Sequence, residues 1–238
     1  MRKRDGKNNL VAKKITNSLG HHTTVWVKID GDPKRIKQSK TTKLMRSHNS
    51  IVGKLNKDIK EGGEKEGLAS VVRIMMHTGI RIGNEKSADG YKSLRDKKIK
   101  QTFGLSTIKK EHVHFDKNGV TLKFQGKRDV TQEIRIDDSQ VVAMVKMLYD
   151  EAGDGEIVPY TPYEVAKYIK STIGNEFTPK DLRMVRANRE AIKQMVKLYK
   201  KPKVKTISEV NAEINEICDH VSDVLGNTRG VAKRSYIN

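Results

Sequence analysis

Tyrosine and basic side chains are the residues of this sequence whose types and spacing point to chemistry. The segment Leu225-Gly-Asn-Thr-Arg-Gly-Val-Ala-Lys-Arg-Ser-Tyr236 places one tyrosine after a glycine-containing loop and several cations. A phenol with its reference pKa of about 10 is a poor nucleophile at neutral pH, but nearby cations favour the phenolate. We therefore expect Tyr236 to attack a phosphate group if the chain supplies further cations. Read alone, the tyrosine fits better as an aromatic residue at a helix end.

Three other stretches offer such cations. Arg81 follows an apolar segment that we predict to be a buried helix ending at Gly79, so its side chain can be aimed into a cleft. Its local setting alone favours a surface arginine near a helix end. Lys127 lies at the tip of a predicted hairpin, where a lysine is usually solvated but can also reach into a DNA groove. Lys180 and Arg183 lie one turn apart near a predicted helix N-terminus, which is a ready anion site.

The charge of the chain favours a polyanionic partner. Its 238 residues carry 48 Lys and Arg against 29 Asp and Glu, which gives a formal net charge of +19. Such a charge concentrates polyanions and releases counterions when they bind. Nucleic acid is the first candidate partner and an anionic membrane the second. No run approaches the roughly 18 apolar residues that span a bilayer, and no apolar stretch follows the basic start, so we expect neither a membrane span nor a secretory signal.

Metal and disulfide chemistry are not expected from the composition. The single cysteine, Cys218, cannot form a disulfide within one chain, and its place in an apolar helical pattern predicts a core position. The adjacent pair His21-His22 does not share a helix face and has no third ligand spaced nearby. We therefore predict a protein without a metal site, in a reducing compartment.

The elements that position these side chains begin with a short β/α region. Residues 10–16 and 23–29 are predicted strands of a hairpin, which is either a DNA-contacting flap or a structural ribbon. Residues 34–59 form a long, basic, weakly helical pattern with one apolar stripe. The glycine-rich loop at 61–67 is the expected internal boundary.

The remainder predicts a helical domain with a small sheet. A charged loop or frayed helix over 86–101 separates the buried helix at 67–79 from three strand candidates, at 105–115, 120–124 and 132–136. Helix signals then follow over 139–149, 162–174, 178–199 and 208–225. We predict an α+β fold: a mostly helical domain with a small antiparallel three-stranded sheet and a short amino-terminal β/α region. The predicted domains cover residues 1–65 and 66–238.

The order of these stretches resembles that of type IB DNA topoisomerases, in the compact form found in poxviruses and bacteria. The resemblance covers about residues 66–237 and is carried by Thr78-Gly-Ile-Arg-Ile-Gly-Asn-Glu85, Phe103-Gly-Leu-Ser-Thr-Ile-Lys-Lys-Glu-His-Val113, Phe124-Gln-Gly-Lys127, Lys180-Asp-Leu-Arg183, and Leu225-Gly-Asn-Thr with Lys233-Arg-Ser-Tyr-Ile237. Any one of these pieces would be a weak signal, but five in the same order are specific.

The resemblance implies a role for each matching position. Tyr236 would attack a backbone phosphorus, leaving a 3′-phosphotyrosyl link and a free 5′-hydroxyl. Arg81 and Arg183 would hold the non-bridging oxygens and offset the charge that develops in the transition state. Lys127 would donate a proton to the departing 5′-oxygen. Asn227 would contact the phosphate, as a His or Asn does at this place in the family.

The resemblance also implies the partners. Double-stranded DNA would be bound by further contacts from Lys180, Lys233, Arg234 and Arg128. The expected activity is relaxation of supercoiled DNA by transient single-strand cleavage and religation, without ATP, metal or any other cofactor. We expect a monomer that acts as a clamp on DNA, located in the cytoplasm or nucleoid or with viral DNA, and neither secreted nor membrane-bound. The region 1–65 would contact DNA and 66–238 would be catalytic.

Two other functions remain open. A tyrosine recombinase uses the same nucleophile and phosphate clamp, but typically shows His-x-x-Arg where this sequence has Lys180-Asp-Leu-Arg183. Recombinases also usually need a tail after the tyrosine, which is not expected here. A non-catalytic, basic DNA-binding protein would explain the net charge but not the ordered arginine, lysine, arginine and tyrosine.

Overall fold

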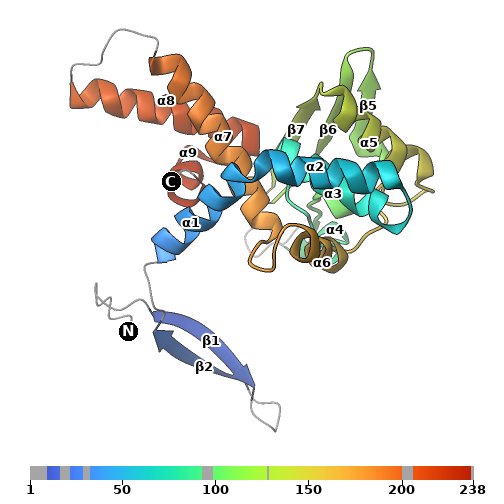
Figure 1. Cartoon of the computed structure of the whole chain (residues 1–238), viewed down its shortest axis with the longest axis horizontal. Coiled ribbons are helices and arrows are strands. Elements are labelled where there is room, and N and C mark those ends of the chain that lie inside the picture. Colours follow the sequence, from blue (N-terminus) through green and yellow to red (C-terminus); the bar gives the residue numbers. More distant parts are fainter. Residues whose placement is uncertain are drawn as a thin grey trace. The chain divides into compact units, whose positions relative to one another are not determined.

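The computed structural model describes residues 10–16, 22–28, 33–92, 99–127, 129–199 and 206–236, and the chain divides into two compact units, Met1–Lys43 and Leu44–Asn238 (Figure 1). In the smaller unit, β1 (Leu10–Thr16) pairs antiparallel with β2 (His22–Lys28), which confirms the predicted hairpin strands. The loop predicted between them lies outside the described residues.

Two helices replace the single basic pattern predicted over 34–59. They are α1 (Pro33–Arg46) and α2 (His48–Glu61), and α2 buries Ile51 and Leu55 of the apolar stripe. The expected boundary is a tight turn at Gly62-Gly63, where both residues have positive φ, and α2 packs against the helix that follows it.

That helix, α3 (Glu64–Thr78), is the buried one that the apolar run predicts, although it begins three residues before Gly67. It ends as expected at Gly79, whose φ of 70° lets its N–H bond to the carbonyl of Met75. The charged stretch after it contains a short helix, α4 (Glu85–Ala88), and a small ribbon of β3 (Tyr91–Lys92) and β4 (Ile99–Lys100).

The main sheet has the antiparallel order β5 (Val113–Asp116), β6 (Gly119–Gly126) and β7 (Val130–Ile136), which confirms the three-stranded sheet. The first strand, predicted over 105–115, begins only at Val113. Residues 105–112 instead form two short 3-10 turns, η1 (Leu105–Thr107) and η2 (Lys110–His112). The backbone N–H groups of Leu105 and Ser106 bond to the carbonyls of Arg81 and Ile82, so they are not available to a sheet.

The helices of the second half begin where their capping signals predict. They are α5 (Ser139–Glu151), α6 (Pro162–Thr172), α7 (Pro179–Tyr199) and α8 (Ile207–Leu225). A further helix, α9 (Arg229–Ser235), lies where the sequence indicated only a basic segment. The fold is α+β and mostly helical, as predicted. No helix among the described residues is long and apolar enough to cross a bilayer.

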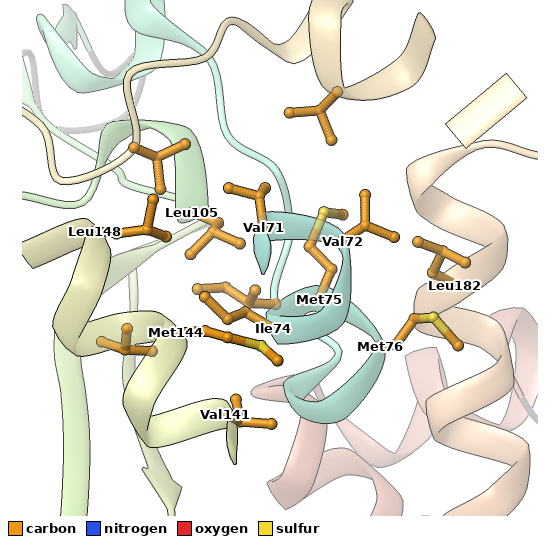
Figure 2. Packing of buried hydrophobic residues seen from close by; sticks show 14 of the residues in the cluster. Val71, Val72, Ile74, Met75, Met76, Leu105, Val141, Met144, Leu148 and Leu182 are labelled. Atoms are coloured by element: carbon orange, nitrogen blue, oxygen red, sulfur yellow. The ribbon is translucent and has the colours of Figure 1, made fainter. Parts of the chain in front are cut away.

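Two hydrophobic cores meet along α7. In the larger one, Val71 and Ile74 of α3 lie toward Leu105 and Met144, while Met76 faces Leu182 of α7 (Figure 2). The smaller core joins α7, α8 and α9 through Met184, Ala187, Ala191, Val221, Leu225, Ala232 and Tyr236. Cys218 of α8 is buried, as predicted. Because α7 belongs to both cores, it fixes α9 relative to the rest of the larger unit.

Candidate active site

A cleft of about 810 Å³ in the larger unit gathers residues from distant parts of the chain. Its walls come from the loop after α3, the β6–β7 hairpin, the start of α7 and the junction of α8 with α9. The predicted catalytic residues all line it, together with Lys180: Arg81, Lys127, Arg183, Asn227 and Tyr236. The structure therefore brings together the side chains that the motifs singled out separately.

The backbone of Arg81 is held in place by a hydrogen bond to the neighbouring 3-10 turn. Its carbonyl accepts the N–H of Leu105 at 2.8 Å, which ties the Arg81 loop to η1. Two glycines make this close approach possible, since a Cβ on Gly104 would lie 2.5 Å from the Cα of Gly83. The Arg81 side chain then donates from Nη2 to Oδ1 of Asn227 at 2.8 Å. The turn after α3 thus presents this arginine to the cleft from a rigid base.

Asn227 lies at a sharp turn between α8 and α9. Gly226 ends α8 with a left-handed φ of 56°, and the N–H of Asn227 bonds to the carbonyl of Ser222 at 2.8 Å. The amide oxygen of Asn227 accepts the hydrogen bond from Arg81, so the amide nitrogen, Nδ2, takes no part in this contact. This Nδ2 is buried and has no hydrogen-bond partner among the residues that the structure describes. Because a buried amide without a partner is costly, this nitrogen is a candidate donor to an oxygen bound in the cleft.

Arg183 is a deeply enclosed cation of the cleft, with only 4% of its surface exposed. Its Nη1 and Nη2 donate to the carbonyls of Gly79 and Leu225, at the C-terminal ends of α3 and α8. Helix C-termini carry partial negative charge, so they stabilise a buried guanidinium. Burial and the nearby Arg81 lower its pKa to about 10, which leaves the side chain charged at neutral pH.

Tyr236 receives a hydrogen bond from this arginine. Nε of Arg183 lies 3.2 Å from the phenolic Oη, and the guanidinium carbon is 5.3 Å from the ring centroid. Burial of Tyr236 raises the pKa of its phenol, but the charges of Arg183 and Arg81 and the bond from Arg183 outweigh burial and leave the pKa below 10. The ring itself belongs to the smaller core, so Tyr236 is both a helix-end aromatic and a polarised phenol.

Lys127 is exposed at the tip of a braced hairpin. The side chain of Gln125 donates to the backbone carbonyl of Asp129 at 2.9 Å, and Nζ of Lys100 lies 2.6 Å from the Asp129 carboxylate. Asp129 itself has a positive φ of 63°. These contacts hold the base of the loop and leave the Lys127 side chain exposed at the cleft.

The residues predicted to contact DNA are only partly gathered at the cleft. Lys180, on the first turn of α7, lines it. Lys233 and Arg234 are exposed on α9 but are not among the lining residues. Arg128 lies outside the described residues.

Two residues that touch this site were missed from the sequence. Asn188 of α7 donates to the backbone carbonyl of Tyr236 at 2.7 Å. Gln132 of β7 contacts the Gly226 turn, with its Nε2 3.4 Å from the Gly226 carbonyl. Asn188 lies four residues after Met184 on a helix face that is otherwise apolar, which marks a buried polar side chain but does not reveal its partner. Gln132 takes the inward position of the alternation that Ile134 and Ile136 continue, which marks a buried polar side chain but does not reveal its partner.

The scaffold and the cleft described above belong to a chain that matches a family of DNA topoisomerases. Residues 27–236 match the family model described as eukaryotic DNA topoisomerase I, catalytic core, and the chain belongs to that family. This confirms the resemblance found in the motifs, and the match begins well before the first of them.

Known proteins similar to this chain include a topoisomerase and a site-specific recombinase. DNA topoisomerase 1B of Acanthamoeba polyphaga mimivirus is 25% identical in an alignment of 183 positions, which covers 71% of this chain and 52% of the relative. The chain therefore spans about half the length of this curated relative. The crystal structure of the XerH site-specific recombinase, bound to palindromic difH substrate in a post-cleavage complex, matches with a TM-score of 0.45 and 13% identity. That match covers 79% of this chain and 47% of the recombinase chain.

Proposed function

We propose that this chain relaxes supercoiled DNA as a type IB topoisomerase, with Tyr236 as its nucleophile. The observation that carries the proposal is the contact of Nε of Arg183 with the phenolic Oη of Tyr236, inside a cleft that Arg81 and Lys127 also line. A buried phenol paired with an arginine has its reactive oxygen fixed, and its lowered pKa increases the fraction present as phenolate.

The proposed reaction exchanges one phosphodiester for another. The Oη of Tyr236 bonds to a backbone phosphorus as the bond from phosphorus to the 5′-oxygen breaks, which leaves a 3′-phosphotyrosyl link and a 5′-hydroxyl. The phenol loses its proton to solvent, and the departing 5′-oxygen gains one from the Lys127 ammonium, which solvent then reprotonates. Religation runs the same exchange in reverse. Because the covalent link conserves the bond energy, religation would need no ATP. The fixed arginines would do the electrostatic work that a metal ion does in other enzymes.

Fixed donors would stabilise the charge that develops on the phosphate. Arg81 contacts Asn227 in the cleft, and a phosphate oxygen would complete the hydrogen bonding of the buried Nδ2, which lacks a partner within the described part of the chain. Arg183 has five N–H groups, of which three make the contacts described above, so two remain for an oxygen. Donors fixed before the reaction stabilise a transition state without reorganisation.

The basic surface would hold the DNA around this cleft. Lys180, Lys233 and Arg234, together with Arg128, would contact backbone phosphates, and counterion release would make binding strongly salt-dependent. Residues 1–65 would contribute DNA contacts and 66–238 the chemistry, in a monomer that clamps the duplex. Such a protein would act wherever its DNA lies, in the cytoplasm or nucleoid or with a viral genome.

Plasmid relaxation tests the proposal. Negatively and positively supercoiled plasmids are incubated with the protein at low salt in EDTA and without ATP, beside a Tyr236→Phe control. We expect the wild-type protein to remove both signs of supercoil and the Tyr236→Phe variant to remove neither. Supercoils that persist with folded wild-type protein would contradict the proposal.

A further inference from the structure

Asn188, a residue of α7 that the proposed mechanism does not use, holds the backbone of Tyr236. Its side chain is buried, with 8% of the residue exposed. Nδ2 donates to the carbonyl of Tyr236 at 2.7 Å and to the carbonyl of Met184, one turn back along α7, at 2.8 Å. An amide nitrogen has two hydrogens, so these bonds use its whole donor capacity.

The Tyr236 carbonyl needs such a donor because of its place in the chain. Tyr236 directly follows α9, and the last carbonyls of a helix have no partner within the helix. Only 7% of the residue is exposed, so an unpaired carbonyl there would lose its bonds to water without replacement. If position 188 served only for packing, an apolar side chain would suffice, as at Met184, Ala187 and Ala191 on the same helix.

One helix therefore holds both ends of the tyrosine. Arg183 bonds to the phenolic Oη and Asn188, five residues later on α7, bonds to the backbone carbonyl. Together the two contacts fix where the Tyr236 backbone lies and where its ring points. α7 is itself anchored in the larger core through Leu182 and Val185. Attack at phosphorus is sensitive to displacements of about an ångström, so a frame of this kind bears on the rate.

We propose that Asn188 is a positioning residue for strand cleavage, which sets the direction of the Tyr236 phenol by holding its carbonyl. The inference rests on the proposed role of Tyr236 as the nucleophile. Asn188 acts through Tyr236 and makes no contact with the DNA. Its loss should slow cleavage and religation by similar factors, because both directions pass through the same transition state, and should leave DNA affinity unchanged.

The test measures single-turnover cleavage of a suicide duplex at saturating protein, with DNA affinity and melting temperature measured in parallel. Asn188→Leu replaces the amide with an apolar side chain that has no donor, and we expect its cleavage rate to fall about tenfold or more. Asn188→Asp places a carboxylate against a carbonyl oxygen at neutral pH. Its protonated form has one O–H donor, so its rate relative to wild type should rise as the pH is lowered.

A core variant separates positioning from stability. Val221→Ala removes volume from the same small core without touching the polar atoms of Tyr236, and should lower the melting temperature while keeping cleavage within about twofold of wild type. If Asn188→Leu cleaved at the wild-type rate, this inference would be overturned while the proposed function would stand. The same holds if Val221→Ala, at an equal melting temperature, lost as much cleavage rate as Asn188→Leu. If wild-type protein formed no covalent adduct, the proposed function would fail, and this inference with it.

Discussion

The Nε atom of Arg183 lies 3.2 Å from the Oη atom of Tyr236, and both residues are buried. The other two nitrogens of this guanidinium bind the carbonyls that end α3 and α8. One side chain thus links the three segments that carry Arg81, Asn227 and the tyrosine. Arg183 has a structural role and an electrostatic one, and the two can be separated experimentally.

Arg183→Lys keeps the charge but cannot make three directed contacts at once. We expect it to lose about a hundredfold or more in cleavage rate and also to lose thermal stability, because carbonyls of Gly79 and Leu225 are left unpaired. Cleavage kinetics and thermal melting measure the two effects. The control is Arg135→Lys, at an exposed pair with Asp116 on the sheet, which should change neither. An Arg183→Lys variant that cleaves at the wild-type rate would refute the role given to this guanidinium.

The pKa of Tyr236 gives a prediction about pH. Burial alone would raise the pKa, but Arg183 and Arg81 lower it below 10, so the phenolate forms at a lower pH than in the unfolded chain. Cleavage should therefore speed up as the pH rises, with a midpoint lower than that of an unperturbed tyrosine. Because the folded pKa is depressed, this ionisation also adds stability as the pH rises through it. The absorbance titration of tyrosinate in wild type minus Tyr236→Phe measures the pKa, and a midpoint at or above the reference value would contradict the account.

The turn at Gly226 should not tolerate a side chain. Its φ is left-handed, and a Cβ would lie 2.0 Å from side-chain atoms of Gln132. Gly226→Ala should destabilise the protein by about 1–3 kcal/mol and displace Asn227, lowering the cleavage rate. Gly153→Ala, where a Cβ meets nothing within 4 Å, is the matched control. Adding Gln132→Ala should recover part of the loss; no recovery would show that backbone strain alone accounts for the effect.

The exposed cations of α9 should affect binding and leave chemistry alone. Replacing Lys233 and Arg234 together with Gln should weaken DNA binding at all sequences and reduce the slope of log affinity against log salt by about 2. Cleavage at saturating protein should be unchanged. Titrations at several salt concentrations measure the slope. An unaltered slope would mean that these side chains do not contact phosphates.

The larger part of the fold could be predicted because its signals are local. The pairs Thr161 with Glu164 and Thr178 with Asp181 make their capping bonds within one turn, so sequence alone locates the helix starts. Gly79 is likewise explained by its own backbone conformation. Residues 105–112 were misassigned because the N–H groups at their start bond to the Arg81 loop, a partner distant in the sequence.

The sequence predicts which residues belong to the candidate site, but not the contacts that they make with one another. Arg81, Arg183 and Tyr236 carry recognisable motifs, but their mutual contacts depend on how α3, α7 and α9 pack. α9 itself was missed because its seven residues contain Gly230 and are too short to show an apolar period. Asn188 interrupts an apolar helix face, but no sequence pattern identifies the carbonyls of Tyr236 and Gly226 as the partners of Asn188 and Gln132.

Covalent trapping on a suicide duplex tests the central claim most directly. The duplex is designed so that cleavage releases a short 5′-hydroxyl fragment, which dissociates and prevents religation. It is incubated with wild-type protein or with Tyr236→Phe. Any covalent adduct is then digested and its peptides are mapped. The account predicts an adduct with wild type only, with the DNA attached to the peptide that contains Tyr236, while the Tyr236→Phe variant binds the duplex with wild-type affinity. An adduct on another residue, or one that forms with Tyr236→Phe, would contradict it.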